Sequence, residues 1–362
     1  MDKEKGPGAV LRNESKKIHD LMERIGRPVR LMEVCGTHTM AVFRHGIRSM
    51  LPEGLSLLSG PGCPVCVTPV GDIDAAISLA MDKGVILTTF GDMMRVPGSK
   101  ASLAEARAQG ADIRVVYSPL EALEAADRHK DREVVFFATG FETTSPLVAA
   151  TILEAEDRGI RNFTILCVHK LVPPALRALL NSGDVQVDGF ILPGPVSAII
   201  GSRPYGFLVE EYRKPSVITG FEARDILTGI EMIMEQIASG TARIGNQYAR
   251  VVREEGNPKA LSILRRVFDV EDARWRGIGT LPDSGLRPGE AFLERDALTR
   301  FGLDTNSSDE PSACDCGEVL KGMKVPTDCR LFGKACTPEK PVGACMVSTE
   351  GSCAAYYRYM PR

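Results

Sequence analysis

Short apolar runs alternate with helix-like segments over residues 28–225, and this alternation constrains the fold more than any other feature of the chain. Continuous apolar runs of this length suit strands that are buried on both faces, as in parallel sheets. Strands are expected at 29–35, 55–60, 84–90, 113–117, 133–139, 163–168, 189–193 and 216–219, and helices at 72–82, 102–109, 119–128, 144–158 and 173–181. The alternation predicts α/β sheets with right-handed crossovers.

Two pairs of similar segments indicate an internal repeat. LSGPGCPVCVTP at 58–69 resembles LPGPVSAIIGSRP at 192–204, and LTTFG at 87–91 resembles FATGF at 137–141. The pairs predict two similar α/β halves, one with cysteines and one without. The alternative is coincidence, because turns with Gly and Pro follow strands in many proteins.

The rest of the chain has a different pattern. Residues 222–239 and 241–268 are expected to be mainly helical, and residues 276–312, rich in Gly, Pro and Ser, are expected to be irregular. The tail from Cys314 to Arg362 contains Gly, Pro and Cys throughout and shows little periodicity. Such a segment cannot rely on a hydrophobic core alone, which predicts that it is organised around a metal.

Composition excludes several classes of function. The chain is 44% hydrophobic, and its 44 basic and 47 acidic residues give a net charge of −3. Without a concentrated basic surface, neither a nucleic acid nor an anionic membrane is an expected partner. No segment reaches the ~18 consecutive apolar residues of a membrane span. The polar N-terminus, MDKEKGPGAVLRNESKK, lacks the apolar core of a signal peptide, so a cytoplasmic location is expected.

Ten cysteines are many for such a chain, and clustered cysteines in a reducing compartment indicate metal binding or redox chemistry. The strongest signal is the tail pattern Cys329-x6-Cys336-x8-Cys345-x7-Cys353. Four thiolates can hold a [4Fe–4S] cluster. These spacings are longer than the C-x2-C pairs of structural zinc sites, so a cluster is favoured over the alternative, a zinc site with four cysteine ligands. Cys314 or Cys316 could replace one of the four.

A second pattern is Gly62-Cys63-Pro64-Val65-Cys66, between an expected strand and an expected helix. The helix N-terminus lowers the pKa of the first thiol, which predicts a thiolate that exchanges with disulfides or binds a metal. The motif therefore indicates a redox-active dithiol at Cys63 and Cys66. The alternative is half of a zinc knuckle, which would need a second C-x2-C pair that the chain lacks.

A third pattern is Cys35-Gly36-Thr37-His38 at the end of the first expected strand. A cysteine and a histidine three residues apart in a turn can face one ion, and thiolate with imidazole suits a transition metal such as iron. The carboxyl ends of strands in α/β sheets are where sites form. Cys35 and His38 are therefore candidate metal ligands.

A fourth pattern, Thr139-Gly140-Phe141-Glu142-Thr143-Thr144, follows another expected strand. Thr143 or Thr144 could cap the next helix. Glu142 could be an acid of the site, or only a charge that is favoured near a helix N-terminus. The residues alone favour the structural interpretation.

Together these motifs resemble a known family. MEVCGTHTMA (32–41), GPGCPVCVTP (60–69), GFETTSP (140–146) and the tail CGEVLKGMKVPTDCRLFGKACTPEKPVGACMVSTEGSCAAYYRY are similar to the HypD family of hydrogenase maturation proteins. The resemblance covers most of the chain. It implies a scaffold for the Fe(CN)2(CO) group of [NiFe]-hydrogenases, in which Fe(II) carrying CN and CO is the assembly substrate. It also implies two partners, a HypC-type small chaperone and a HypE-type cyanide donor.

The resemblance further assigns roles to residues. The [4Fe–4S] cluster would be held by Cys329, Cys336, Cys345 and Cys353. The iron site would contain Cys35 and His38, and a redox-active dithiol between the iron site and the cluster would be formed by Cys63 and Cys66. The resemblance also implies functional roles for Glu142, Thr143 and Thr144. It implies two similar parallel-sheet α/β domains, 28–132 and 133–222, and a third, partly helical domain from 1–27 and 223–362 with the Cys-rich tail. A maturation factor is expected rather than a turnover enzyme. The competing hypotheses are a [4Fe–4S]-dependent protein disulfide reductase and a binding module whose cluster is purely structural.

Overall fold

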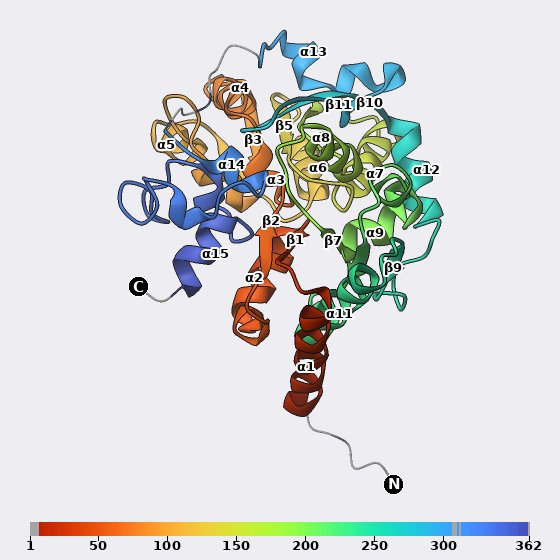
Figure 1. The fold of residues 1–362 in the computed structure, drawn as a ribbon. Coiled ribbons are helices and arrows are strands. Elements are labelled where there is room, and N and C mark those ends of the chain that lie inside the picture. Colours follow the sequence, from red (N-terminus) through yellow and green to blue (C-terminus); the bar gives the residue numbers. More distant parts are fainter. Residues whose placement is uncertain (1–6, 306–309, 311–312, 361–362) are drawn as a thin grey trace.

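A computed structural model describes residues 7–305, 310 and 313–360, and two parallel β-sheets form its centre (Figure 1). Residues 1–6 and 306–309, which belong to the expected third domain, lie outside the described residues. Sheet A has the order β2 (Leu55–Ser59), β1 (Val29–Glu33), β7 (Gly189–Pro193), β8 (Ser216–Thr219) and β9 (Ile244–Asn246). Sheet B has the order β4 (Ile113–Val115), β3 (Val85–Thr89), β5 (Glu133–Ala138) and β6 (Phe163–Cys167). The predicted α/β class with parallel sheets is confirmed.

All eight expected strands are present; two, at 189–193 and 216–219, have the expected bounds, and the other six are shorter. Every residue of β3, β7 and β8 is buried, as the continuous apolar runs predict. The helices of the α/β part are α2 (Gly36–Arg44), α3 (Pro64–Val67), α4 (Val70–Ala80), α5 (Leu103–Ala108), α6 (Pro119–Arg128), α7 (Ser145–Asp157), α8 (Val172–Asn181), α9 (Gly194–Ile200) and α10 (Phe207–Glu210). Side-chain caps define some of them: Ser102 and Glu105 form a capping box at the start of α5.

The sheets are interleaved along the chain. The chain builds β1 and β2 of sheet A, then all of sheet B, and returns to sheet A with β7. The ranges 28–132 and 133–222 therefore each contribute strands to both sheets, and the expected boundaries do not coincide with the division between them. The similar segments at 58–69 and 192–204 both follow strands of sheet A, so that pair reflects similar strand ends within one sheet.

The region after β8 differs from the expectation. Helix α11 (Ala223–Ser239) is present, but 241–268 is not one helical stretch, because it contains β9 and α12 (Pro258–Val267). Of the range 276–312, which was expected to be irregular, residues Gly279–Pro288 form strand β11, which pairs antiparallel with β10 (Phe268–Trp275), and Ala297–Phe301 form helix α13. The hairpin is half-buried and irregular in register, and its turn uses Gly277 at a positive φ of 70°. Such a strand lacks the continuous apolar run of a parallel-sheet strand.

The two ends of the chain pack on sheet A. Helix α1 (Pro7–Ile25) lies along α11, at the bottom of Figure 1. The tail contains α14 (Cys316–Leu320), the short 3₁₀ helices η5 (Pro326–Asp328) and η6 (Ala344–Met346), and α15 (Ser352–Tyr359), which packs on α2. One buried core joins residues of both sheets with Cys316 and Cys345 of the tail. Among the described residues no helix is both long and apolar enough to cross a membrane.

Candidate metal and thiol centre

Strand order marks one favoured position for a site in each sheet. In sheet A the order reverses between β1 and β7, and Cys35 follows the carboxyl end of β1. In sheet B it reverses between β3 and β5, and Glu142 follows the carboxyl end of β5. Ligands of open α/β sheets bind at such switch points, because the loops leave a crevice there as they diverge. Two of the sequence motifs therefore occupy the favoured position of their sheet.

The CGTH and CPVC loops are in direct contact. The backbone N–H of Gly36 donates to the carbonyl of Gly62 at 3.0 Å. A Cβ on Gly62 would overlap the backbone of Cys35, so only glycine permits this approach. Because β1 and β2 are parallel neighbours in register, their carboxyl ends bring both motifs to the same edge of sheet A.

Cys35 precedes the first turn of α2 and is half-buried. Burial and the nearby Glu350 carboxylate raise the pKa of its thiol to about 11, although N–H groups and the hydroxyl of Thr37 act in the opposite direction. The thiol is therefore protonated at neutral pH when it has no metal. A bound cation would favour the thiolate, because metal ligation requires deprotonated cysteine.

His38 lies in α2 rather than in a turn, and it is fully buried. Its Nε2 lies 3.1 Å from the carbonyl oxygen of Gly220 and 2.8 Å from Thr219 Oγ1, both at the end of β8. Because a carbonyl oxygen only accepts, a hydrogen bond to Gly220 requires the tautomer with the proton on Nε2 and the lone pair on Nδ1. Nδ1 is buried and has no hydrogen-bond partner within the described part of the chain. Burial lowers the pKa of His38 to about 4, so the ring is neutral at pH 7.

Cys63 and Cys66 form a disulfide at the start of α3, with Cα atoms 5.2 Å apart. Both are buried, and the N–H of Cys66 points at Cys63 Sγ from 3.2 Å. Helix α3 packs against η6, which contains Cys345. The CPVC motif thus touches the CGTH loop on one side and a cysteine-bearing segment of the tail on the other.

All six tail cysteines line one small cavity. Its walls are Cys314, Cys316, Cys329, Cys336, Cys345 and Cys353, with the apolar side chains of Val319, Leu331, Phe332 and Met346. The Sγ atoms of Cys316 and Cys345 are 2.7 Å apart. Hydrogen bonding with the side chains of Cys314 and Cys345 holds the pKa of Cys316 well below its ordinary range. The N–H of Val342 donates to Cys336 Sγ at 3.3 Å.

This donor set fits an iron–sulfur cluster. Thiolate sulfurs in an apolar wall, with a backbone N–H aimed at one of them, are the surroundings that such clusters use. Within the described part of the chain, no three His, Cys, Asp or Glu side chains are grouped as ligands of a single ion. A cubic cluster needs its ligands around a volume rather than around a point. The cavity brings together the four cysteines of the sequence pattern and the two that could replace one of them.

The GFETT residues have different environments. Glu142 is buried, and its Oε1 accepts a hydrogen bond from the N–H of Val172 at the start of α8. Thr144 stands at the N-cap of α7, but its side chain makes no capping bond and instead lies against Gly140. Thr143 is exposed. The expected threonine cap is therefore not formed, because Thr144 has helical rather than extended backbone angles.

Two residues near these motifs, Glu350 and Tyr205, have no signal of their own in the sequence. Glu350, in the tail, accepts a hydrogen bond from Thr37. Tyr205 is fully buried and receives a hydrogen bond from Ser197 Oγ at 3.4 Å. Burial raises the pKa of its phenol, and the nearby Glu142 carboxylate acts in the same direction. The GPVS segment after β7 resembles the CPVC loop, which is the one signal that could have pointed to this region.

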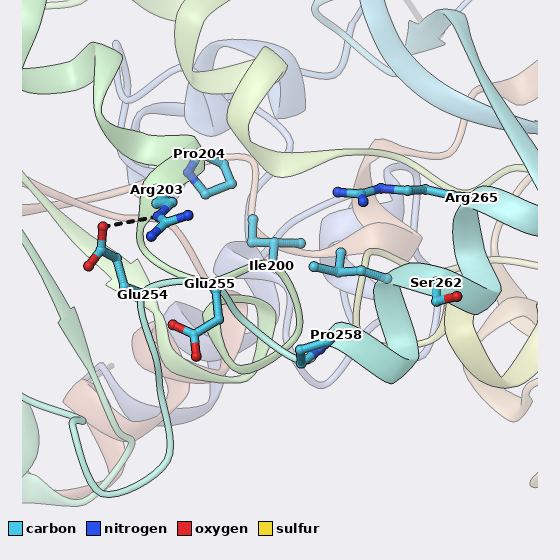
Figure 2. A pocket seen from close by; sticks show the side chains of 9 residues that line it. Ile200, Arg203, Pro204, Glu254, Glu255, Pro258, Ser262 and Arg265 are labelled. Atoms are coloured by element: carbon cyan, nitrogen blue, oxygen red, sulfur yellow. Dashed lines mark hydrogen bonds and ion pairs between the residues drawn. The ribbon is translucent and has the colours of Figure 1, made fainter.

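Larger open grooves than the cysteine cavity lie elsewhere. One of about 500 Å³ is formed by α9, α12 and the loops beside them, and Figure 2 shows its lining, with Arg203 paired to Glu254. Its other walls include Ile200, Pro204, Glu255 and Arg265. Such a mixture of compensated charges and aliphatic surface has no group suited to thiol or transition-metal chemistry.

Comparison with known proteins agrees with these motifs. The family model for HypD, described as the hydrogenase formation hypA family, matches residues 9–360. The hydrogenase maturation factor HypD of Azotobacter vinelandii is 49% identical over 340 residues, covering 92% of this chain and 90% of that protein. The HypD of Rhodobacter capsulatus is 48% identical over 352 residues, with 95% and 93% covered. A putative hydrogenase expression/formation protein of Methanocaldococcus jannaschii is 44% identical over 351 residues, with 97% of each covered. The chain belongs to the HypD family of hydrogenase maturation factors.

Proposed function

We propose that this maturation factor is the scaffold on which the Fe(CN)2(CO) group of a [NiFe]-hydrogenase is assembled. The observation that carries the proposal is the contact between three thiol-bearing segments: the CGTH loop touches the CPVC loop, and the CPVC helix touches the tail. A site for a metal substrate and a source of reducing equivalents would then be neighbours. Cytoplasmic assembly belongs to the same proposal, because thiols of this kind persist in reducing compartments.

The iron substrate would be held by Cys35 and by Nδ1 of His38. Thiolate and imidazole suit Fe(II). The carbonyl of Gly220 favours the His38 tautomer that leaves the Nδ1 lone pair for a metal. A hydrogen bond of this kind on the other ring nitrogen commonly orients a ligating histidine. A HypC-type chaperone would complete the coordination, and a HypE-type partner would deliver cyanide.

The dithiol of Cys63 and Cys66 would supply electrons to the reaction. Its oxidation to the disulfide releases two electrons and two protons, and two electrons are what release of cyanide from a thiocyanate-like carrier requires. The oxidised form is the one in this structure. Glu142, with a buried carboxyl whose pKa is raised to about 7 by desolvation, is able to hold or release a proton near neutral pH.

The tail would hold a [4Fe–4S] cluster through Cys329, Cys336, Cys345 and Cys353. When bound, such a cluster supplies single electrons at low potential. Cys314 and Cys316 line the same cavity, and either could take the place of one ligand.

Anaerobic purification followed by Mössbauer and infrared spectroscopy, with and without the small chaperone, tests the scaffold function. A [4Fe–4S] signal with additional low-spin iron and with cyanide and carbonyl stretches is expected in the complex. A cluster signal without additional iron or those bands would favour the second candidate, a cluster-dependent protein disulfide reductase. The buried Cys63–Cys66 disulfide is the observation in favour of that candidate, and steady turnover of a disulfide substrate with an electron donor would identify it.

A further inference from the structure

One segment of the tail reaches the CGTH loop, and it joins two cysteines of the tail cavity. Glu350 lies between Cys345 and Cys353 in the chain. The Thr37 hydroxyl donates a hydrogen bond to Glu350 Oε1 at 2.7 Å. Thr37 also contacts the Cys35 thiol through its side chain and its backbone N–H. A single hydroxyl group therefore lies between the tail carboxylate and the candidate iron ligand.

The segment is tightly packed at both ends. A Cβ on Gly36 would overlap the backbone carbonyl of Glu350, and a Cβ on Gly351 would overlap the backbone of Cys345. Two glycines thus allow the segment to lie against the first turn of α2 while it folds back on a cavity cysteine. A displacement of Cys345 or Cys353 cannot leave Glu350 where it is.

A second contact holds the same segment from the side of sheet B. The N–H of Glu350 donates to Ser348 Oγ, which in turn donates to Asp92 Oδ2, each at 3.1 Å. Asp92 lies in the 3₁₀ helix η2 (Gly91–Arg95), which follows β3. Glu350 is therefore oriented by its own loop and not only by Thr37.

We infer that Glu350 is a positioning residue which couples the occupancy of the tail cavity to the Cys35 site through Thr37. The inference rests on the proposed cluster site. With thiolate ligands bound to a cluster, the 345–353 segment is fixed and Glu350 covers the first turn of α2. When no cluster is bound, the 345–353 segment is released, and the Cys35 thiol becomes accessible to solvent.

Alkylation of Cys35 in the full chain tests this coupling. Anaerobically purified protein, either iron-loaded or stripped by a chelator, is pulsed with iodoacetamide, and modification of the Cys35 peptide is followed by mass spectrometry. Release of the segment breaks the hydrogen bond between Thr37 and the charged Glu350 carboxylate, and hydrogen bonds to charged groups are stronger than those between neutral groups. Removal of the cluster is therefore expected to raise the rate of Cys35 alkylation in the wild type about tenfold or more. In Thr37→Val the two rates are expected to be nearly equal, whereas Thr37→Ser, which keeps the hydroxyl, behaves as wild type.

A second pair of variants tests the same coupling in case Thr37→Val does not fold. Glu350→Ala is expected to abolish the difference between the loaded and stripped forms, and Glu318→Gln, elsewhere in the tail, is expected to keep it. Iron content and cluster absorbance are recorded for each sample. A cluster-loaded variant that lacks the Thr37–Glu350 bond but retains the wild-type response overturns the inference and leaves the proposed function intact. Absence of any bound cluster in the wild type overturns both.

Discussion

Glu142 Oε1 accepts a hydrogen bond from the backbone N–H of Val172 at 2.9 Å, and Oε2 of the same carboxyl is buried with no hydrogen-bond partner among the described residues. Desolvation raises the pKa of this carboxyl from 4.5 to about 7. The protonated form is therefore the one that the fold prefers. The Val172 bond satisfies an N–H at the start of α8, so Glu142 connects the switch point of sheet B to the next helix.

This relationship predicts a pH dependence of stability. Because the folded-state pKa of Glu142 is raised, its contribution is fully present below about pH 4.5 and is lost as the pH rises through about 7. At about 1.4 kcal/mol per pKa unit, the wild type should lose roughly 3 kcal/mol across this window from Glu142 alone. Glu142→Gln keeps an acceptor for the Val172 N–H and cannot ionise. It should gain stability relative to wild type at pH 8 but not at pH 5.

Anaerobic denaturant unfolding at the two pH values measures the difference. Glu255→Gln is the matched control, because Glu255 is an exposed carboxylate in the groove of Figure 2. It should follow the wild type at both pH values. If Glu142→Gln and wild type lose the same stability between pH 5 and pH 8, the raised pKa is not a property of the folded protein.

The contact between the CGTH and CPVC loops predicts a strong effect of Gly62→Ala. The added methyl group would overlap the backbone of Val34 and Cys35, and backbone cannot move aside as a flexible side chain can. The substitution should cost at least about 2 kcal/mol of unfolding free energy and separate the two motifs. Gly84→Ala, in an exposed turn where the added Cβ meets only the Asp82 side chain, is the control. Equal stabilities of the two variants would show that the loops tolerate separation.

The individual strands of the two sheets could be predicted from the sequence, whereas the order in which they pair could not. Apolar runs such as 133–139 and 189–193 have the length and the continuity of strands buried on both faces, so periodicity suffices to find them. Strand order is different, because it depends on long-range pairing: β1 is paired with β7, which follows it by more than 150 residues. The hairpin β10–β11 was missed, because its turn residues and half-buried strands resemble an irregular segment.

The candidate site shows the same contrast between residues that a local sequence pattern reveals and residues that only tertiary packing brings together. Cys35, Cys63 and the tail cysteines are recognisable because cysteine clusters are rare and their spacing is informative. Tyr205 and Glu350 belong to no such pattern. They approach the motifs only through tertiary packing, as the 2.7 Å bond between Thr37 and Glu350 illustrates. A polar residue that acts by position rather than by type has no local sequence signal.

The proposed role of the dithiol predicts a separation between cofactor binding and maturation. Cys63 and Cys66 line the contact between the CGTH loop and η6, but neither lines the tail cavity. Cys63→Ala and Cys66→Ala should therefore keep the iron and the cluster absorbance of the wild type while abolishing hydrogenase maturation in a complementation assay. Full maturation by either variant would exclude a dithiol as the electron source.

The tail cavity predicts which cysteines are ligands. Alanine at Cys329, Cys336, Cys345 or Cys353 should each remove most of the bound iron, since a cubic cluster that loses one of four thiolates is exposed to solvent and oxidant. Cys314→Ala should retain it. Iron and acid-labile sulfide analysis after anaerobic purification gives the measurement.

Cys316 is the variant that decides between ligand sets. Its thiol lies 2.7 Å from that of Cys345 and has a lowered pKa, so it already has the character of a ligand. The spacing pattern nevertheless predicts that Cys316→Ala keeps its cluster, because the four cysteines of that pattern all line the same cavity. If Cys316→Ala loses its iron while Cys329→Ala or Cys353→Ala retains it, Cys316 takes the place of that residue. One ligand would then be the first residue of α14, a position that sequence spacing alone does not select.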